Sequence, residues 1–231
     1  MVPMGPDITT SALIIVDMQN DFVHRDGALG RRAREDVDAG IDMDFLASTI
    51  PNVRRIAEAF RYHDRPVVYV TQVLKPDYAD AAFPYWRRRR PSNFIVEGTW
   101  GAQIIDELTP HAGDHLVIKK GFGGFANTPL DTILRNCGVN TCVVTGVTTC
   151  VCVSSTVRGG VEYNYRMIVV QDAVAEIHRD AHDAELKTLA RVFADVKTAD
   201  EVVRMLDEAR SKAVTRHASE PAFGSVMRRE Q

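Results

Sequence analysis

Apolar residues in this chain form short continuous runs, separated by longer stretches in which they recur every three or four positions. The continuous runs, rich in β-branched residues, predict strands. They lie at residues 11–16, 66–71, 115–119, 140–146, 166–171 and 195–197. The stretches of helical spacing predict helices. They lie at residues 44–63, 100–108, 127–136, 152–158, 181–193 and from 198 onward. Strands that alternate with helices indicate an α/β fold: a parallel, Rossmann-like sheet between two helical layers, a three-layer αβα sandwich.

Length and composition add a domain plan to this pattern. The 231 residues suffice for one large core, which we place at residues 11–210. Residues 1–10 are expected to form an N-terminal extension, residues 211–231 a polar tail, and the Arg- and Gly-rich residues 24–42 a loop. Residues 198–201 have the pattern of a helix-capping box. A net charge of −3 gives no reason to expect nucleic acid or a membrane surface as a partner.

The compartment follows from what the sequence lacks. It has no apolar run of 18 residues, and its first residues do not resemble a signal peptide. The four cysteines match neither a Cys-x-x-Cys pair nor a zinc-finger spacing. Cys150 and Cys152 are too close in sequence for an ordinary disulfide, and Cys137 and Cys142 are expected to be small buried side chains. We therefore expect a reduced, cytoplasmic protein.

Polar groups with reactive chemistry stand at the ends of three predicted strands. Asp17 closes the first strand, Lys119 closes the third, and Cys152 follows the fourth at the start of a helix. The carboxyl ends of parallel strands lie at one edge of a sheet, so these side chains are expected to meet. The helix start should favour a thiolate at Cys152. Alternatively, Asp17 is a plain turn cap and Cys152 a buried side chain in a flavodoxin-like binding module.

Together these three side chains predict acyl transfer from an amide to water. A thiolate is a strong nucleophile, and a carboxylate can take its proton and pass it to a leaving amine. A nearby ammonium would keep the carboxylate ionised and stabilise the thiolate. Backbone N–H groups around Thr148 and Cys152 would suit an oxyanion.

Three motifs in order along the chain resemble the isochorismatase-like cysteine hydrolases. They are residues 12–22, 119–125 and 146–153, and the resemblance extends over about residues 10–208. It implies the isochorismatase-like hydrolase fold, with Asp17 as general base, Lys119 rather than Lys120 as its partner, and Cys152 as nucleophile. It also implies a cis peptide between Val147 and Thr148 that helps to place the oxyanion donors.

The chain departs from the family patterns in ways that narrow the expected chemistry. Cys150 stands where Asn or Asp is usual, Gly123 where Ser is usual, and Phe122 where Tyr or, in biuret hydrolases, Lys is usual. True isochorismatases lack the nucleophilic cysteine, so Cys152 argues against a vinyl-ether hydrolase. Residues 71–74 lack the Asp-x-His motif of zinc-type nicotinamidases. We therefore predict no metal and no cofactor.

The resemblance is strongest to the ureidoacrylate amidohydrolases, through residues 98–100, 106–108 and 125–131. Enzymes acting on N-carbamoyl compounds, biuret and triuret are similar as well. The implied substrate is a small ureido or amide compound that releases ammonia or carbamate. Several aromatic and basic side chains are candidates for contact with it: Phe22, Trp86, Arg87, Trp100 and Phe122.

Two questions stay open at this point. The run Arg87–Arg90 is either a solvated or subunit-contact surface, or part of a substrate-covering loop that recognises a carboxylate. The resemblance implies a homo-oligomer, a dimer or tetramer, in which the C-terminal tail could also take part. A different kind of protein is also possible, a non-catalytic or redox-sensing member that uses Cys150 and Cys152 together. A lowered pKa at Cys152 alone would favour the enzyme.

Overall fold

The computed structural model describes residues 6–82 and 93–219, and its centre is a parallel sheet. Six strands pair in the order β3-β2-β1-β4-β5-β6, every neighbouring pair parallel. Their bounds are β1 Ser11–Val16, β2 Val67–Gln72, β3 His115–Lys119, β4 Thr141–Val147, β5 Arg166–Ala175 and β6 Asp195–Lys197. The parallel α/β architecture predicted from the sequence is confirmed.

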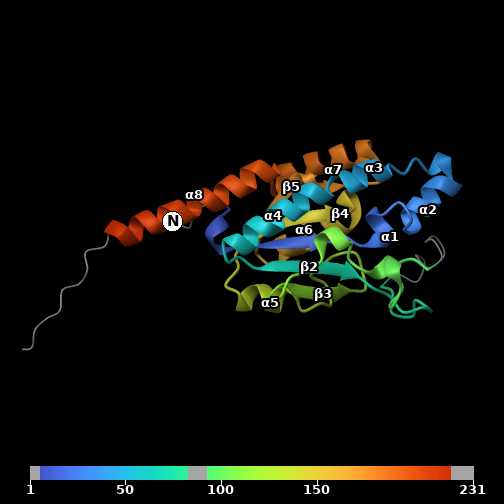
Figure 1. The fold of residues 1–231 in the computed structure, drawn as a ribbon, viewed down its shortest axis with the longest axis horizontal. Helices are drawn as coiled ribbons and strands as arrows, with labels where there is room; N and C mark the ends of the chain where they lie inside the picture. The colour runs from blue at the N-terminus through green and yellow to red at the C-terminus, as the bar shows by residue number, and fades with distance from the viewer. Residues whose placement is uncertain (1–5, 83–92, 220–231) are drawn as a thin grey trace, which may run out of the picture.

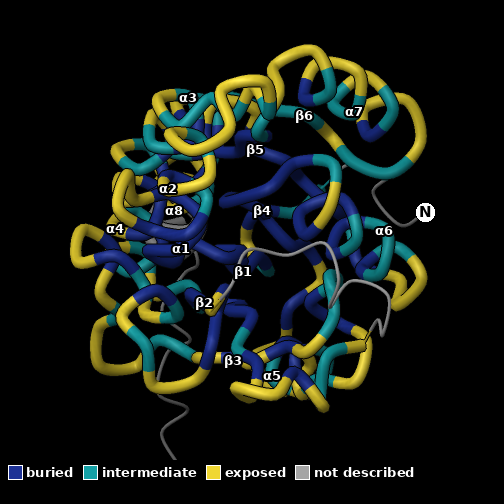
Figure 2. Tube along the Cα trace, turned by 90° about the vertical axis from the view of Figure 1, so that its right-hand side faces the viewer, coloured by how far each residue is buried: buried dark blue, intermediate teal, exposed yellow. Residues whose placement is uncertain are grey.

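Helices cover both faces of this sheet (Figure 1). On one face lie α3 Met43–Ser48, α4 Ile50–Tyr62 and α8 Ala199–Ser219. On the other face lie α5 Leu130–Asn136, α6 Ser154–Glu162 and α7 Arg179–Val192. Figure 2 shows the buried strands between α4 and α8 on one side and α6 on the other. The alternate residues of each central strand feed the two apolar cores.

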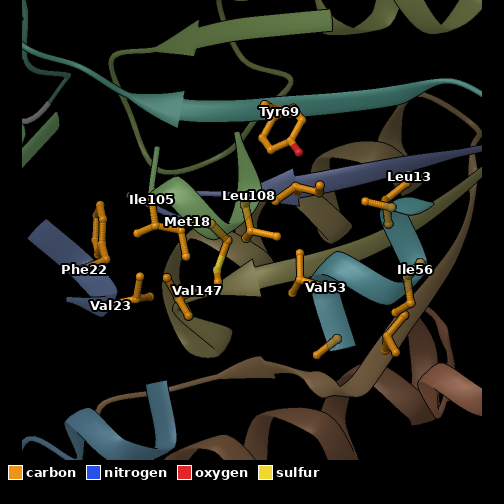
Figure 3. Packing of buried hydrophobic residues seen from close by; sticks show 14 of the residues in the cluster. Leu13, Met18, Phe22, Val23, Val53, Ile56, Tyr69, Ile105, Leu108 and Val147 are labelled. Atoms are coloured by element: carbon orange, nitrogen blue, oxygen red, sulfur yellow. The ribbon is translucent and has the colours of Figure 1, made fainter. Parts of the chain in front are cut away.

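The core under α3, α4 and α8 extends to the carboxyl edge of the sheet. Figure 3 shows Val147, the last residue of β4, packed among Met18, Val23 and Ile105 of this core. Val147 is fully buried. The chain that leaves β4 toward the predicted nucleophile is therefore anchored by packing at its first residue.

Several predicted element boundaries were wrong, each for a local reason. Residues 24–42 are not a loop, because α2 spans Ala28–Glu35 as a helix whose arginines point to solvent and which buries only Ala28 and Gly30. The predicted helix 44–63 is broken at Thr49, where Thr49 Oγ1 donates to Leu46 O, and the next helix begins at Ile50 with Pro51 in its first turn. Residues 100–108 form two 3₁₀ turns, η4 Trp100–Ala102 and η5 Asp106–Leu108.

The C-terminal part differs in extent. The capping box is present: Thr198 N donates to Glu201 Oε2, and Glu201 N donates to Thr198 Oγ1. The helix that it opens, α8, continues through Ser219 into the segment predicted as a tail. None of the helices in the described ranges has the length and apolar character that crossing a bilayer requires.

Gly146 allows β4 to run close beside β1 just before the nucleophile turn. It pairs with Val16 of β1 and has a φ of 107°, in the left-handed region. A Cβ atom built on it would collide with the carbonyl oxygen of Val16. The end of β4 therefore requires a residue without a side chain.

We expect Gly146→Ala to lower the free energy of unfolding by about 2–5 kcal/mol, the sum of a left-handed alanine and an overpacked contact. Urea denaturation measures this change. The control is Gly113→Ala, at a φ of 99° but with no atom within 4 Å of the added methyl group. Gly113→Ala therefore measures only the cost of placing an alanine in the left-handed region, about 1–2 kcal/mol. Equal losses in the two variants would show that the contact with β1 is unimportant.

Candidate active site

Asp17, Lys119 and Cys152 meet at the carboxyl edge of the sheet. Asp17 directly follows β1, Lys119 ends β3, and Cys152 lies in the turn after β4. Lys119 Nζ is 2.8 Å from Asp17 Oδ2 and 3.4 Å from Cys152 Sγ. The carboxylate of Asp17 is also near enough to the thiol of Cys152 to raise the pKa of that thiol. The side chains of Asp17 and Lys119 are fully buried, and Cys152 is 3% exposed.

The aspartate is held in an unusual backbone conformation. Its φ is 50°, which is uncommon outside glycine and asparagine. Asp17 N donates to Val70 O of β2, and Asp17 Oδ1 accepts from Gln72 N at 2.9 Å. Gln19 braces the same strand end, because its side chain donates to Gln72 O and accepts from Gln72 N. Strand β2 therefore fixes both the backbone and the carboxylate of Asp17, although the strain is at Asp17 itself.

The ammonium group of Lys119 has three partners. It forms an ion pair with Asp17 Oδ2 and donates hydrogen bonds to Cys152 Sγ and to the carbonyl oxygen of Gly121, the last at 3.1 Å. Lys120, the neighbouring candidate, instead donates to Val73 O and pairs with Asp80 near the surface. The geometry therefore places Lys119, and not Lys120, between the thiol and the carboxylate.

Cys152 lies in a turn of special geometry. The peptide bond between Val147 and Thr148 is cis, at the position that the resemblance implies. A π-helical turn, η6, spans Thr149–Val153 and leads directly into α6. The helix predicted at 152–158 corresponds to α6, Ser154–Glu162, which begins and ends later, and Cys152 lies in the π-helical turn before it.

A buried hydroxyl joins this turn to the loop that follows Lys119. Thr156 Oγ1 donates to Cys152 O at 2.7 Å and accepts from Gly124 N at 3.0 Å. The loop carrying Phe122 is thus joined to the turn that carries the nucleophile. The partly buried Phe122 packs against the apolar cluster that contains Cys152.

The charge states in the site differ from the sequence expectation. Burial, and then the nearby Asp17 carboxylate, raise the pKa of the Cys152 thiol, although Lys119 acts in the opposite direction. Burial also raises the pKa of Asp17 against the effect of Lys119. For Lys119, burial lowers the pKa, but Asp17 and Cys152 together raise it above its usual value. The raised pKa of Cys152 is opposite to the lowered pKa expected from the helix start, and it favours a thiol beside the Asp17–Lys119 ion pair.

A second polar group, missed in the sequence, supports the turn from behind. The buried Glu176 accepts from Cys150 N at 2.8 Å and from Ile177 N at 2.9 Å. His182 of α7 lies 2.9 Å from the hydroxyl of Thr149. Glu176 directly follows β5, as Asp17 directly follows β1. An acidic residue at the carboxyl end of a predicted strand is the sequence feature by which Glu176 could have been predicted.

Cys150 faces this second group and not the catalytic candidates. Its thiol donates to Ala181 O at 3.3 Å, and burial together with Glu176 raises its pKa to about 12. Cys142 is buried as expected, whereas Cys137 is exposed, which corrects the expectation for that residue. Its sulfur lies 3.8 Å from His115 Nε2 at the edge of the sheet.

The other predicted contact residues are placed unevenly. Phe22 is buried in the core under α3, α4 and α8, on the other face of the sheet from Cys152. The centroids of the Phe22 and Phe94 rings are 4.9 Å apart. Trp100 is 46% exposed and packs edge-on against His24. Trp86, Arg87 and the rest of the arginine run lie outside the described residues. Of this predicted set, Phe122 is the residue brought into the apolar cluster of Cys152. Among residues 6–82 and 93–219, no group of three or more His, Cys, Asp or Glu side chains could hold a metal ion.

A parallel sheet with a cysteine, a carboxylate and a lysine in contact at its carboxyl edge defines a class of α/β proteins with a cysteine-centred site. Residues 11–201 match the isochorismatase domain. This chain belongs to the isochorismatase family of hydrolases, as its motifs predicted.

Relatives with assigned names support the same family. The chain is 34% identical to the ureidoacrylate amidohydrolase RutB of Methylorubrum extorquens, covering 90% of this chain and 88% of that protein. Among solved structures, a cysteine hydrolase from Pseudomonas syringae pv. phaseolicola 1448A is 27% identical with a TM-score of 0.79, covering 90% and 98% of the two chains. The N-carbamoylsarcosine amidase of Thermoplasma acidophilum is 35% identical with a TM-score of 0.68, and the match covers 83% of this chain and 97% of that chain.

The arrangement predicts opposite effects of two substitutions on thiol labelling. Asp17→Asn removes the carboxylate that raises the pKa of Cys152, so the thiolate fraction at pH 8 should rise. Lys119→Met removes the cation that lowers this pKa, so the fraction should fall. Each unit of pKa changes the fraction about tenfold while the thiol form dominates, and we expect at least threefold changes in rate.

The measurement is the rate of modification by methyl methanethiosulfonate, followed by intact mass from pH 6 to 10. Cys137→Ser and Cys150→Ser in every variant prevent labelling of the two more accessible thiols. The rate for the parent should still rise with pH near neutrality, because its thiol holds its proton there. A parent rate that is already constant at pH 7, or a slower Asp17→Asn variant, would contradict this assignment of charges.

Proposed function

We propose that this protein is a cysteine-dependent amidohydrolase that cleaves a C–N bond of a small ureido or amide compound. The observation that carries the proposal is the continuous contact from Asp17 through Lys119 to Cys152, buried at the edge where parallel α/β sheets bind ligands. A buried ion pair next to a thiol is costly to form and is weak evidence for stability. It is better explained by chemistry.

In the proposed first half of the reaction, Asp17 takes the proton of the Cys152 thiol as the sulfur attacks the substrate carbonyl carbon. The negative charge that develops on the carbonyl oxygen is stabilised by backbone N–H groups at Thr148 and Cys152. Collapse of this intermediate breaks the C–N bond, and Asp17 returns the proton to the leaving amine. The acyl group remains on Cys152 as a thioester.

In the second half, Asp17 takes a proton from water, which attacks the thioester carbonyl. The thiol leaves with that proton, and the acid product is released. Lys119 keeps its ion pair with Asp17 and its hydrogen bonds to Cys152 and Gly121, and it offsets the negative charge that moves between sulfur and carboxylate. The raised pKa of Asp17 suits a group that must hold the proton between the two steps. The proposed reaction uses only side chains and backbone of this chain and draws on no cofactor.

The substrate class is proposed from two relatives. Ureidoacrylate and N-carbamoylsarcosine, the compounds in the names of those enzymes, both contain a carbamoyl group on nitrogen. A compound with this ureido group is therefore the proposed substrate, and Phe122 a proposed wall of its pocket. The roles of Phe22, Trp86, Arg87 and Trp100, the homo-oligomer and the cytoplasmic location stay predictions.

A redox-sensing role for Cys150 and Cys152 is less well supported. The two thiols have separate partners, Ala181 O for Cys150 and the Lys119 ammonium for Cys152. Burial and the nearby Glu176 raise the pKa of Cys150 to about 12, which disfavours the thiolate that a second exchanging thiol would require. The contacts therefore favour a single nucleophile over a pair of exchanging thiols.

The test is ammonia release from a panel of N-carbamoyl amino acids and primary amides. Removal of the nucleophile in Cys152→Ala should lower kcat/KM at least 1,000-fold on the best substrate, and Asp17→Asn about 100-fold to 10,000-fold. Cys150→Ser is the matched control and should stay within about threefold of the parent. Circular dichroism and thermal unfolding establish that each variant is folded. Activity that survives in folded Cys152→Ala would refute the proposed nucleophile.

A further inference from the structure

Gln72 ends strand β2 beside the catalytic candidates. It is paired in register with Lys119 of β3. Val68 and Val70 of β2 and Val117 of β3 all belong to the apolar cluster that contains Cys152. Since side chains alternate between the two faces along a strand, Gln72 and Lys119 project to that same face. The side-chain amide of Gln72 therefore lies next to Lys119, on the face of the sheet that carries the nucleophile.

The backbone of Gln72 is fully engaged. Its N–H donates to Asp17 Oδ1 at 2.9 Å and to Gln19 Oε1 at 3.0 Å, and its carbonyl oxygen accepts from Gln19 Nε2 at 3.0 Å. These contacts fix the backbone of Gln72.

That side chain is polar and has no hydrogen-bond partner among the described residues. Gln72 is only 2% exposed. Within the described part of the chain, its Oε1 and Nε2 atoms take part in no hydrogen bond or ion pair. Within the described residues, the fully buried side-chain atoms that lack a hydrogen-bond partner are Asp17 Oδ2 and Asp80 Oδ2, so the unpaired amide of Gln72 keeps a little accessible surface through which a ligand can reach it.

We propose that Gln72 is a specificity-determining residue that recognises the ureido group of the substrate. Its Oε1 accepts the N–H on the acid side of the carbamoyl carbon. A ureido group carries this donor, whereas a simple carboxamide has a methylene in place of that N–H. This inference rests on the proposed amidohydrolase function and deepens it, because it names the feature that separates ureido compounds from plain amides.

Two compounds isolate this single group. N-carbamoylglycine and succinamate have the same length, the same terminal carboxamide and the same carboxylate, and differ only by an N–H in place of a CH₂. The parent enzyme should prefer N-carbamoylglycine in kcat/KM for ammonia release. Gln72→Leu, similar in size but without hydrogen-bonding atoms, should reduce that preference at least tenfold, because it removes the acceptor that only the ureido compound uses.

The matched control is Thr71→Val. Thr71 precedes Gln72 in β2, is also buried, and projects to the opposite face of the sheet. It should leave the ratio of the two substrates within about twofold of the parent. A ratio that is unchanged in Gln72→Leu, or a loss that is equal for both compounds, would overturn the role of Gln72.

Binding separates this proposal from the catalytic one. In the Cys152→Ala background, calorimetry of N-carbamoylglycine and succinamate with and without Gln72→Leu measures recognition without turnover. A preference for N-carbamoylglycine that Gln72→Leu abolishes supports the assignment, even if the parent released no ammonia and the proposed hydrolysis had failed. Equal binding of both compounds to Cys152→Ala, or no binding of either, would refute it.

Discussion

The buried ion pair between Asp17 and Lys119 is the interaction on which the rest of this site depends. Two opposite charges without solvent exposure, 2.8 Å apart, are tolerated only where further hydrogen bonds satisfy both groups. Here Gln72 N completes the carboxylate, while Gly121 O and Cys152 Sγ complete the ammonium. The two charges come from strands β1 and β3, and β2 between them sets their separation. The sheet order is therefore part of the chemistry.

Around this pair, the turn that carries Cys152 is fixed by contacts on more than one side. The nucleophile turn is anchored in one core by Val147 and joined to the opposite loop by Thr156. From behind, Glu176 takes the N–H of Cys150, the residue that stands where Asn or Asp is usual in the family. Glu176, which follows the neighbouring strand β5, thus accepts a backbone N–H of this turn. The side chain of Cys150 is not required for that hydrogen bond.

The sequence predicted those parts of the molecule in which one local pattern decides the outcome. Strands β1 and β3 are apolar runs that end in a charged residue, so their bounds and the meeting of Asp17 with Lys119 followed from the pattern. Helix α2 was missed because it buries almost nothing and owes its place to tertiary contacts. The protonated state of Cys152 was missed because burial, which the sequence does not show, outweighs the helix start. Glu176 and Gln72 gain their roles from neighbours far away in the chain.

The three side chains of the site together carry no net charge, and that balance has a consequence for what the site can admit. One carboxylate, one ammonium and one neutral thiol sum to zero, and the sum is unchanged when the proton moves from sulfur to carboxylate. The transfer of this proton therefore needs no proton from solvent. It also leaves no net charge in the protein interior, where an unpaired charge is costly. A compound whose reacting end is neutral preserves this balance on entry, whereas one with a charged reacting end would break it.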